Sequence, residues 1–176
     1  MGRPSPSRAG GRRAARSDGP STPATVALDR LGVAYTRHPY EHDPATGSYG
    51  LEAAAALGVT PGQVFKTLLV ETAAGLAVGI VPVDRQLDLK AVAAALGVKG
   101  ATMADPRQAE RATGYVVGGI SPVGQRRLLP TVLDETALGF ETVFVSGGRR
   151  GFDLGLAPAD LVTVTRAVTA LVGRHP

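Results

Sequence analysis

The chain has 176 residues, of which 44% are hydrophobic, and this is enough for one domain with a sizeable core. Cysteine is absent, which excludes disulfides, thiolate metal sites and a cysteine nucleophile. No apolar run reaches the roughly 18 residues that a membrane span needs, and the N-terminal stretch lacks the apolar segment of a secretory signal. We therefore expect a cytoplasmic protein that does not associate with membranes.

The net charge of +4 comes entirely from the N-terminal segment. Residues 1–20 carry five arginines against one acidic side chain, and the remainder holds fourteen basic and fourteen acidic side chains. The segment is rich in Gly, Pro, Ser and Arg and cannot bury a core. We predict a disordered basic tail over residues 1–21 and one folded domain over residues 22–176. Three uses of the tail stay open: weak affinity for a polyanion such as RNA, a transit peptide, or a solvated extension.

Short helices and strands are interspersed along the rest of the chain. Thr22 and Pro23 are a capping residue and a first-turn proline, and Gly32 ends the helix that they begin. Two β-rich segments separated by residues 73–75 indicate a hairpin. Short connections and the hairpin favour an α+β fold with a mixed sheet. In chain order we expect a helix at 22–32, a strand at 34–38, a helix at 51–57, strands at 64–70 and 76–83, helices at 88–96 and 105–114, a glycine loop at 118–124, strands at 131–134 and 142–145, a second glycine loop at 146–151, and a helix from 158 followed by a strand or helix.

Lys66 is the most informative side chain in the sequence. It lies within the predicted strand 64–70, on the same face as Leu68 and Val70, and it is one of only three lysines, against sixteen arginines. An ammonium on an apolar face is costly unless it is paired or used. Desolvation lowers a lysine pKa and favours a catalytic group or an oriented donor. The alternative is a surface lysine on an edge strand whose stem covers apolar neighbours.

Both glycine loops are candidate ligand sites. The adjacent Gly118 and Gly119 allow the backbone to approach a ligand closely and to aim N–H groups at an oxyanion. Arg149 and Arg150 lie inside the second loop, where basic pairs suit phosphate contacts. Asp153 follows that loop, in a position to orient Arg150 or a substrate amine. A plain tight turn and a solvated arginine pair are the alternatives.

Other catalytic patterns are incomplete. Residues 38–42 form the string H-x-x-E-H of some zinc proteases, but that motif needs a helix and Pro39 favours an extended backbone. The sequence around Ser121 lacks the glycine at position 123 that a nucleophile elbow needs, and no P-loop is present. We expect neither a metal nor a cofactor. Tyr40 is expected instead to be a hydrogen-bonding aromatic at the mouth of a pocket.

Taken in order, several motifs resemble the YbaK family, the Cys-tRNA(Pro) deacylases, across residues 22–165. The segment before Thr22 has no counterpart in that pattern. The matching segments are 22–24, 40–44, 64–70, 86–90, 103–106, 113–125, 129–131 and 145–151.

The resemblance implies an editing enzyme that acts in trans and hydrolyses the ester between a wrong amino acid and the 3′ end of a tRNA. It implies an α+β fold in which a curled, barrel-like mixed β-sheet and flanking helices surround a central cleft. The lysine on which the family's activity depends corresponds to Lys66, which is therefore the predicted catalytic residue. The predicted substrate-binding residues are Tyr40, Thr67, Gly118, Gly119, Ile120, Ser121, Pro122, Ser146, Gly147, Arg150 and Asp153.

The chain offers no clear nucleophile of its own. The resemblance suggests that the thiol of a cysteinyl substrate attacks the ester while the protein positions it. The implied substrate is Cys-tRNA(Pro), with Cys-tRNA(Cys) as an addition, and the implied partner is prolyl-tRNA synthetase. Two alternatives remain, namely a related deacylase that prefers Ala-tRNA(Pro) and a non-catalytic RNA-binding or regulatory module.

Overall fold

A computed structural model of the chain describes residues 19–176. The predicted basic tail lies outside the described residues except for its last three positions. No helix within residues 19–176 is long and apolar enough to cross a membrane.

Five α-helices and ten strands make up the described part of the chain. The helices are α1 (Pro23–Leu31), α2 (Tyr49–Leu57), α3 (Leu89–Leu96), α4 (Pro106–Thr113) and α5 (Pro158–Thr165). The strands are β1 (Thr36–Pro39), β2 (Val64–Thr72), β3 (Gly75–Pro82), β4 (Gln86–Leu87), β5 (Ala101–Met103), β6 (Thr131–Asp134), β7 (Val143–Arg149), β8 (Phe152–Leu156), β9 (Val168–Ala170) and β10 (Gly173–Arg174). Two short 3-10 helices, Pro61–Gln63 and Glu135–Gly139, precede β2 and follow β6.

Local sequence signals set the ends of the helices. The Thr22 hydroxyl accepts a hydrogen bond from the Thr25 N–H (3.2 Å), and Pro23 occupies the first turn of α1, where its missing N–H costs nothing. The Asp105 carboxylate accepts from the N–H groups of the first turn of α4 in the same way. The first four helices all end at a glycine in the left-handed region, the usual helix stop.

Strand pairing produces one large mixed sheet. Eight strands belong to it, in the order β1-β8-β7-β2-β3-β6-β9, with β5 also paired to β2. The β2–β3 and β7–β8 pairs are antiparallel, whereas β2–β7, β3–β6 and β6–β9 are parallel. The path begins at β1 and ends at β9 without returning, so the described sheet is curled but is not a closed barrel. The predicted α+β fold with a mixed sheet is therefore confirmed, without full closure.

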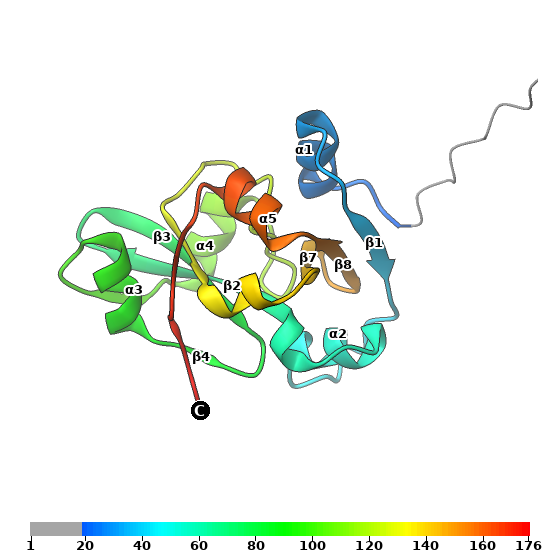
Figure 1. Cartoon of the computed structure of the whole chain (residues 1–176), viewed down its shortest axis with the longest axis horizontal. Coiled ribbons are helices and arrows are strands. Elements are labelled where there is room, and N and C mark those ends of the chain that lie inside the picture. Colours follow the sequence, from blue (N-terminus) through cyan, green and yellow to red (C-terminus); the bar gives the residue numbers. More distant parts are fainter. Residues whose placement is uncertain (1–18) are drawn as a thin grey trace, which may run out of the picture.

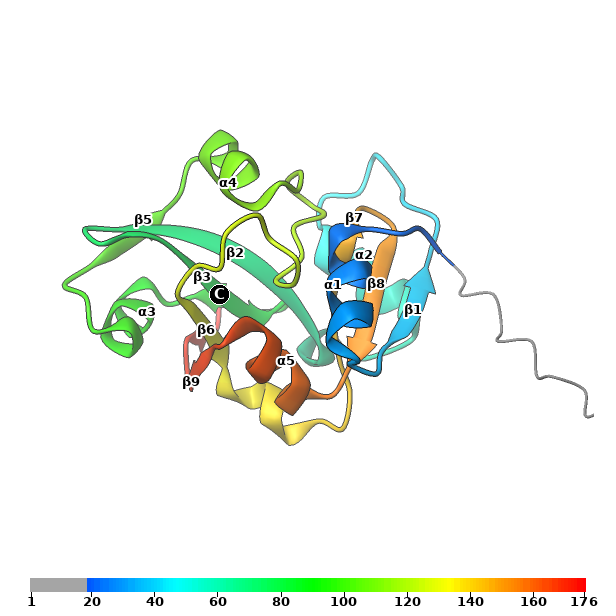
Figure 2. The same cartoon turned by 90° about the horizontal axis from the view of Figure 1, so that it is seen from above.

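The helices divide between the two ends and faces of this sheet. α1 and α2 lie beside the β1-β8-β7 end, and α3 lies at the opposite end, beside the turn of the β2–β3 hairpin (Figure 1). Figure 2 shows α4 on one side of that hairpin and α5 on the other. Four of the largest buried side chains, those of Phe65, Phe152, Ile80 and Leu28, belong to one apolar core between β2, β3, β8 and α1.

Most predicted elements are present, with one clear exception. The hairpin, the four helices before residue 115 and the strand Thr131–Asp134 are confirmed. The second glycine loop was predicted wrongly, because Ser146 to Arg149 continue β7 with a β-bulge and only the turn at Arg150 and Gly151 is a loop. Glycine is unfavourable in strands, but a Cβ at Gly147 would lie 2.5 Å from the Phe152 ring, so packing selects glycine there.

Asp134 joins the C-terminal strands to the sheet. Its side chain is 1% exposed. One carboxylate oxygen accepts from the Thr136 N–H (3.0 Å), and the other accepts from the N–H groups of Val172 (3.0 Å) and Gly173 (2.7 Å). This carboxylate therefore fixes the segment between β9 and β10 against the end of β6.

We predict that Asp134→Ala lowers the free energy of unfolding by about 3 kcal/mol, because three N–H donors, of which that of Val172 is buried, lose a charged acceptor at once. Asp88→Ala, which removes only the N-terminal cap of α3, is the matched control and should cost about 1 kcal/mol. Urea denaturation followed by circular dichroism measures both. Equal losses in the two variants would contradict the proposed anchoring role.

Candidate active site

The candidate site lies at a break in the large sheet. On one side of β2, strand β7 pairs only with Val64 and Phe65, and β5 pairs only with residues 70–72. On the other side, β3 pairs with β2 along its whole length. Residues 66–69 therefore have a strand neighbour on one side only. A cleft of about 400 Å³ lies over this gap between β7 and β5, and the residues of β2 form its floor.

The cleft draws its walls from parts of the chain that are far apart in sequence. β2 supplies the floor, α2 and the segment after β1 supply one wall, and α4 with the first glycine loop supplies the other. Seven of the twelve predicted site residues line it. These seven are Tyr40, Lys66, Thr67, Gly118, Ile120, Ser146 and Asp153.

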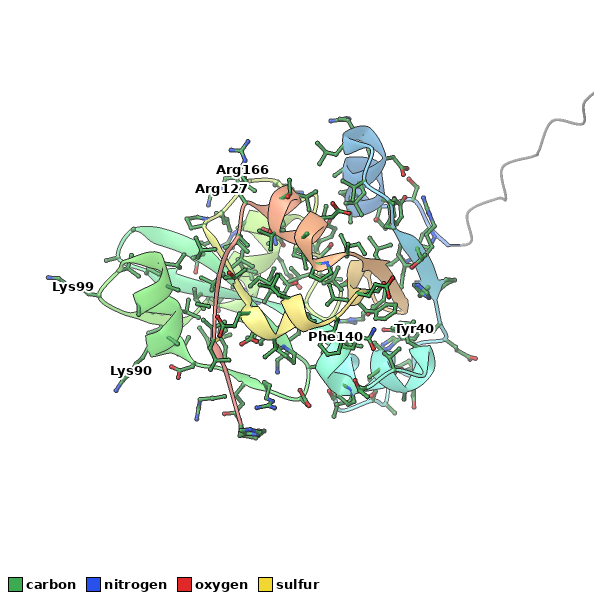
Figure 3. The ribbon with its side chains drawn as sticks, viewed as in Figure 1. Tyr40, Lys90, Lys99, Arg127, Phe140 and Arg166 are labelled. Carbon is green, nitrogen blue, oxygen red and sulfur yellow. The ribbon has the colours of Figure 1, made fainter. Side chains whose placement is uncertain are left out.

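Lys66 lies on the floor of this cleft. Its side chain is half-buried, and no carboxylate of the described residues forms an ion pair with it within 4.0 Å. Burial lowers the pKa of the Lys66 ammonium, and the negative charge of Asp84 partly opposes this effect. The other two lysines, Lys90 and Lys99, are exposed and point outward at the α3 end of the molecule (Figure 3). Lys66 is thus the lysine whose charge faces the cleft.

Thr67 brings unpaired polar groups to the same floor. Its hydroxyl is buried and has no hydrogen-bond partner within the described residues. The N–H of Ala104 donates to the Leu69 carbonyl (3.0 Å), so the peptide groups of the odd-numbered residues of β2 face the side of the gap. The Thr67 peptide group faces the gap for this reason. A buried hydroxyl without a partner costs about 1–3 kcal/mol, which favours a ligand at this point.

Asp153 and Tyr40 form the polar end of the cleft. Asp153 lies on β8, opposite Ser146 of β7 and His38 of β1 in the strand register. Its side chain is 6% exposed, and burial raises the pKa of the Asp153 carboxyl to about 7. Tyr40 follows β1, near β8 and α2 (Figure 3), and its N–H donates to the Gly151 carbonyl (2.8 Å). Burial, and next the charge of Asp153, raise the pKa of the Tyr40 phenol, so it stays a neutral donor.

Arg150 contacts the first glycine loop and α2, which form opposite walls of the cleft. Its guanidinium donates two hydrogen bonds to the Val117 carbonyl (2.7 and 3.1 Å) and lies 4.9 Å from the centre of the Tyr49 ring. Gly118 has a φ of 89°, and a Cβ there would approach the Arg150 Nε to 2.8 Å. Two nitrogens of the Arg150 guanidinium therefore hold the glycine loop, and the predicted substrate contact of Arg150 stays a prediction.

Five predicted site residues do not line the cleft. The Gly119 N–H donates to the Val116 carbonyl (2.9 Å), so it is not free for an oxyanion as predicted. A Cβ at Gly119 would lie 2.8 Å from the Arg149 backbone, which brings the two glycine segments together. Ser121 is fully buried and accepts from the Val123 N–H (3.2 Å). The five residues are Gly119, Ser121, Pro122, Gly147 and Arg150.

The two histidines of the H-x-x-E-H string have separate partners. The His38 ring lies edge-on to Phe144 at 5.2 Å, whereas His42 Nδ1 lies 2.9 Å from a Glu52 carboxylate oxygen. The His42 ring also lies 5.5 Å from that of Tyr49. No group of three His, Cys, Asp or Glu side chains within residues 19–176 is arranged to hold a metal ion.

The sequence did not single out several residues of the cleft. Tyr49 from the first turn of α2, Met103 from β5 and Ala109 from α4 all line it. Each is an ordinary residue of its element, and the sequence carries no signal that its element borders β2. Only the capping of α2 by Ser48, which fixes where Tyr49 enters the helix, is visible in the sequence.

Comparisons with known proteins agree with this arrangement. A family model described as an aminoacyl-tRNA editing domain matches residues 44–164. EbsC of Enterococcus faecalis, named as a candidate Cys-tRNA(Pro)/Cys-tRNA(Cys) deacylase, is 39% identical over 113 residues, which are 64% of this chain and 69% of EbsC. A proline–tRNA ligase of Moorella thermoacetica is 37% identical over 73 residues, which are 42% of this chain and 13% of the ligase.

Solved structures give the same picture. The crystal structure of a candidate trans-editing enzyme for prolyl-tRNA synthetase superimposes with a TM-score of 0.77 at 29% identity and covers 89% of this chain and 99% of that one. The structure of hypothetical protein APE2540 gives a TM-score of 0.78 at 28% identity, over 87% of this chain and 100% of that one. The mixed sheet with its cleft is therefore a fold shared with these proteins.

We predict that Asp153 makes the protein less stable as the pH rises. Its folded pKa of about 7 lies above the ordinary value of 3.8, so between these values the folded state binds more protons than the unfolded state. Stability from this group is complete below pH 4 and is lost as the pH rises to 7, by a few kcal/mol.

Urea unfolding of the wild type and of Asp153→Asn, at intervals from pH 4 to 7.5, isolates this contribution from those of other carboxylates. The wild type should lose stability relative to the variant across this range. Parallel curves for the two proteins would show that the carboxyl is not destabilised by burial.

Proposed function

We propose that this chain, which belongs to the aminoacyl-tRNA editing domain family, removes cysteine from wrongly charged Cys-tRNA(Pro), with Cys-tRNA(Cys) as a second substrate. The editing model covers residues 44–164, and the name of EbsC supports the choice of cysteine. The chain is accordingly a hydrolase of aminoacyl-tRNA esters. The observation that carries the proposal is the Lys66 ammonium, which faces a polar-ended cleft without an ion-pair partner among the described residues.

The aminoacyl end of the tRNA fits the polar groups of the cleft. The Asp153 carboxylate, when ionised, receives the α-ammonium of the amino acid, and the neutral Tyr40 phenol donates to the same end. The unpartnered Thr67 hydroxyl and peptide group bind the terminal ribose or the ester. Lys66 holds the ester oxygen, where a fixed charge in a water-poor site stabilises the developing negative charge better than it would in water.

The nucleophile comes from the substrate in this proposal. The cysteinyl sulfur forms a bond to the ester carbonyl carbon, and the bond from that carbon to the ribose oxygen breaks. The thiol proton ends on the ribose hydroxyl that leaves with the tRNA. The resulting cyclic thioester is then opened by water to give free cysteine. The protein contributes position and electrostatics, and positioning alone can lower a barrier by several kcal/mol.

The location and partners of the chain follow from this substrate. Aminoacyl-tRNA is made in the cytoplasm, which is the proposed site of action. We infer that prolyl-tRNA synthetase is the protein partner, because a trans-editing enzyme for that synthetase shares the fold and a proline–tRNA ligase contains a matching segment. An Ala-tRNA(Pro) deacylase would use the same fold, and comparing the hydrolysis rates of Cys-tRNA(Pro), Ala-tRNA(Pro) and Cys-tRNA(Cys) decides between them.

We predict that Lys66→Ala lowers kcat/KM for Cys-tRNA(Pro) by about 10²–10³-fold, the usual cost of one preorganised charge donor. Lys66→Arg should also be poor, because a planar guanidinium does not replace a compact ammonium. Lys90→Ala removes an exposed lysine from α3 and is the matched control. Release of labelled cysteine measures activity, and circular dichroism checks the fold. Near wild-type hydrolysis by a folded Lys66→Ala protein would exclude a catalytic role for Lys66.

The substrate thiol can be tested without changing the protein. Ser-tRNA(Pro) differs from Cys-tRNA(Pro) only in the atom that attacks, so we predict that it is hydrolysed far more slowly at saturating concentration. Single-turnover rates with the two substrates measure the difference at the chemical step. Equal rates would mean that water attacks directly and that the thiol takes no part.

A further inference from the structure

Helix α4 separates the cleft from a second depression on the molecular surface. Pro106 and Ala109 line the cleft, whereas Gln108, Arg111 and Ala112 line the second depression. The spacing of three and four residues places the two sets on different faces of one helix. Figure 2 shows α4 at the edge of the molecule, with one side toward the β2–β3 hairpin.

The second depression is basic and has a volume of about 370 Å³. Besides the residues of α4, it is lined by Leu76 from β3 and by Arg126 and Arg127 from the loop before β6. All three arginines are exposed, and none forms an ion pair with a carboxylate of the described residues within 4.0 Å. We call the group Arg111, Arg126 and Arg127 the arginine groove.

Arg126 is held against the C-terminal end of α4. The Arg126 N–H donates to the Thr113 carbonyl (3.1 Å), and a Cβ at Gly114 would lie 2.9 Å from the Arg126 Nε. A positive charge near the C-terminal end of α4 is stabilised by the helix dipole. This effect explains a basic residue at position 111 or 126. It does not account for Arg127, which points away from the body of the molecule (Figure 3).

We propose that the arginine groove binds the phosphate backbone of the tRNA whose aminoacyl end occupies the cleft, an inference that rests on the proposed function. Guanidinium groups bind phosphate oxygens with paired hydrogen bonds. A helix is about 10 Å wide, so a strand that crosses α4 spans the two sites with roughly three nucleotides at about 3.4 Å each. Phosphate contacts of this kind position a nucleic acid without reading its sequence.

The test compares two substrates in the full chain. Arg126→Gln/Arg127→Gln should raise the KM for Cys-tRNA(Pro) about tenfold and leave kcat unchanged, because the lost contacts are the same in the ground state and the transition state. The slope of log Kd against log salt concentration for uncharged tRNA(Pro) should become shallower by about 1.4–1.8, at 0.7–0.9 for each phosphate contact. Hydrolysis of cysteinyl-adenosine, which lacks the phosphate backbone, should be unaffected.

Two further variants keep the result interpretable. Lys90→Gln/Lys99→Gln removes two positive charges from the α3 end and should leave the salt slope as it is. Arg111→Gln alone should make the slope shallower by about half as much as the double variant. Because Arg111 lies in α4 and not in the loop before β6, this variant still tests the groove if the double variant does not fold.

An unchanged salt slope and KM in the folded double variant and in Arg111→Gln would overturn the arginine groove. An equal change in Lys90→Gln/Lys99→Gln would overturn it as well, because general charge would then be responsible. If the wild type hydrolyses neither Cys-tRNA(Pro) nor cysteinyl-adenosine yet binds tRNA with the predicted slopes, the proposed function fails and the groove is supported.

Discussion

The interrupted hydrogen-bond ladder along β2 is the constraint on which the site depends. A strand in the middle of a sheet normally pairs on both sides, and an unpaired buried peptide group is costly. Here β7 and β5 border the two ends of β2 and leave residues 66–69 without a neighbour on one side. The fold accepts this gap because β3 pairs along the full length of β2 on the other side. The cleft, its floor and its unused polar groups all result from that interruption.

Desolvation then gives the charged groups of the cleft their properties. Partial burial lowers the pKa of Lys66, and almost complete burial raises that of Asp153. The charged form of each group is therefore less favourable than it would be in water. In the proposed function, a bound aminoacyl end supplies the complementary partners, an ester oxygen for Lys66 and an ammonium for Asp153. On this proposal the substrate completes an electrostatic arrangement that is unsatisfied in the free protein, so the same residues serve binding and catalysis.

The sequence predicted what depends on local chemistry and missed what depends on distant packing. Thr22, Asp105 and the helix-ending glycines act within a few residues, so the helix boundaries were visible. Lys66 stood out because a lysine among β-branched and apolar neighbours is unusual in itself. The sequence did not indicate that the Gly119 N–H is used in a local turn. It also did not indicate that Arg150 bonds the Val117 carbonyl, which lies 33 positions away. Tyr49 and the strand β5 gave no signal, since only the assembled sheet brings them to β2.

The cleft and the proposed arginine groove lie on different faces of α4, and their side chains suit different parts of an aminoacyl-tRNA. The cleft holds groups that suit an amino acid and a ribose, so in the proposed function it selects what is attached to the RNA. The groove offers only guanidinium groups, which bind any phosphate backbone alike, so it adds affinity without choosing among tRNAs. As proposed, neither set of contacts distinguishes tRNA(Pro) from other tRNAs. On this proposal the tRNA is selected by a partner that already holds it, and this is the physical reason for proposing a synthetase as that partner.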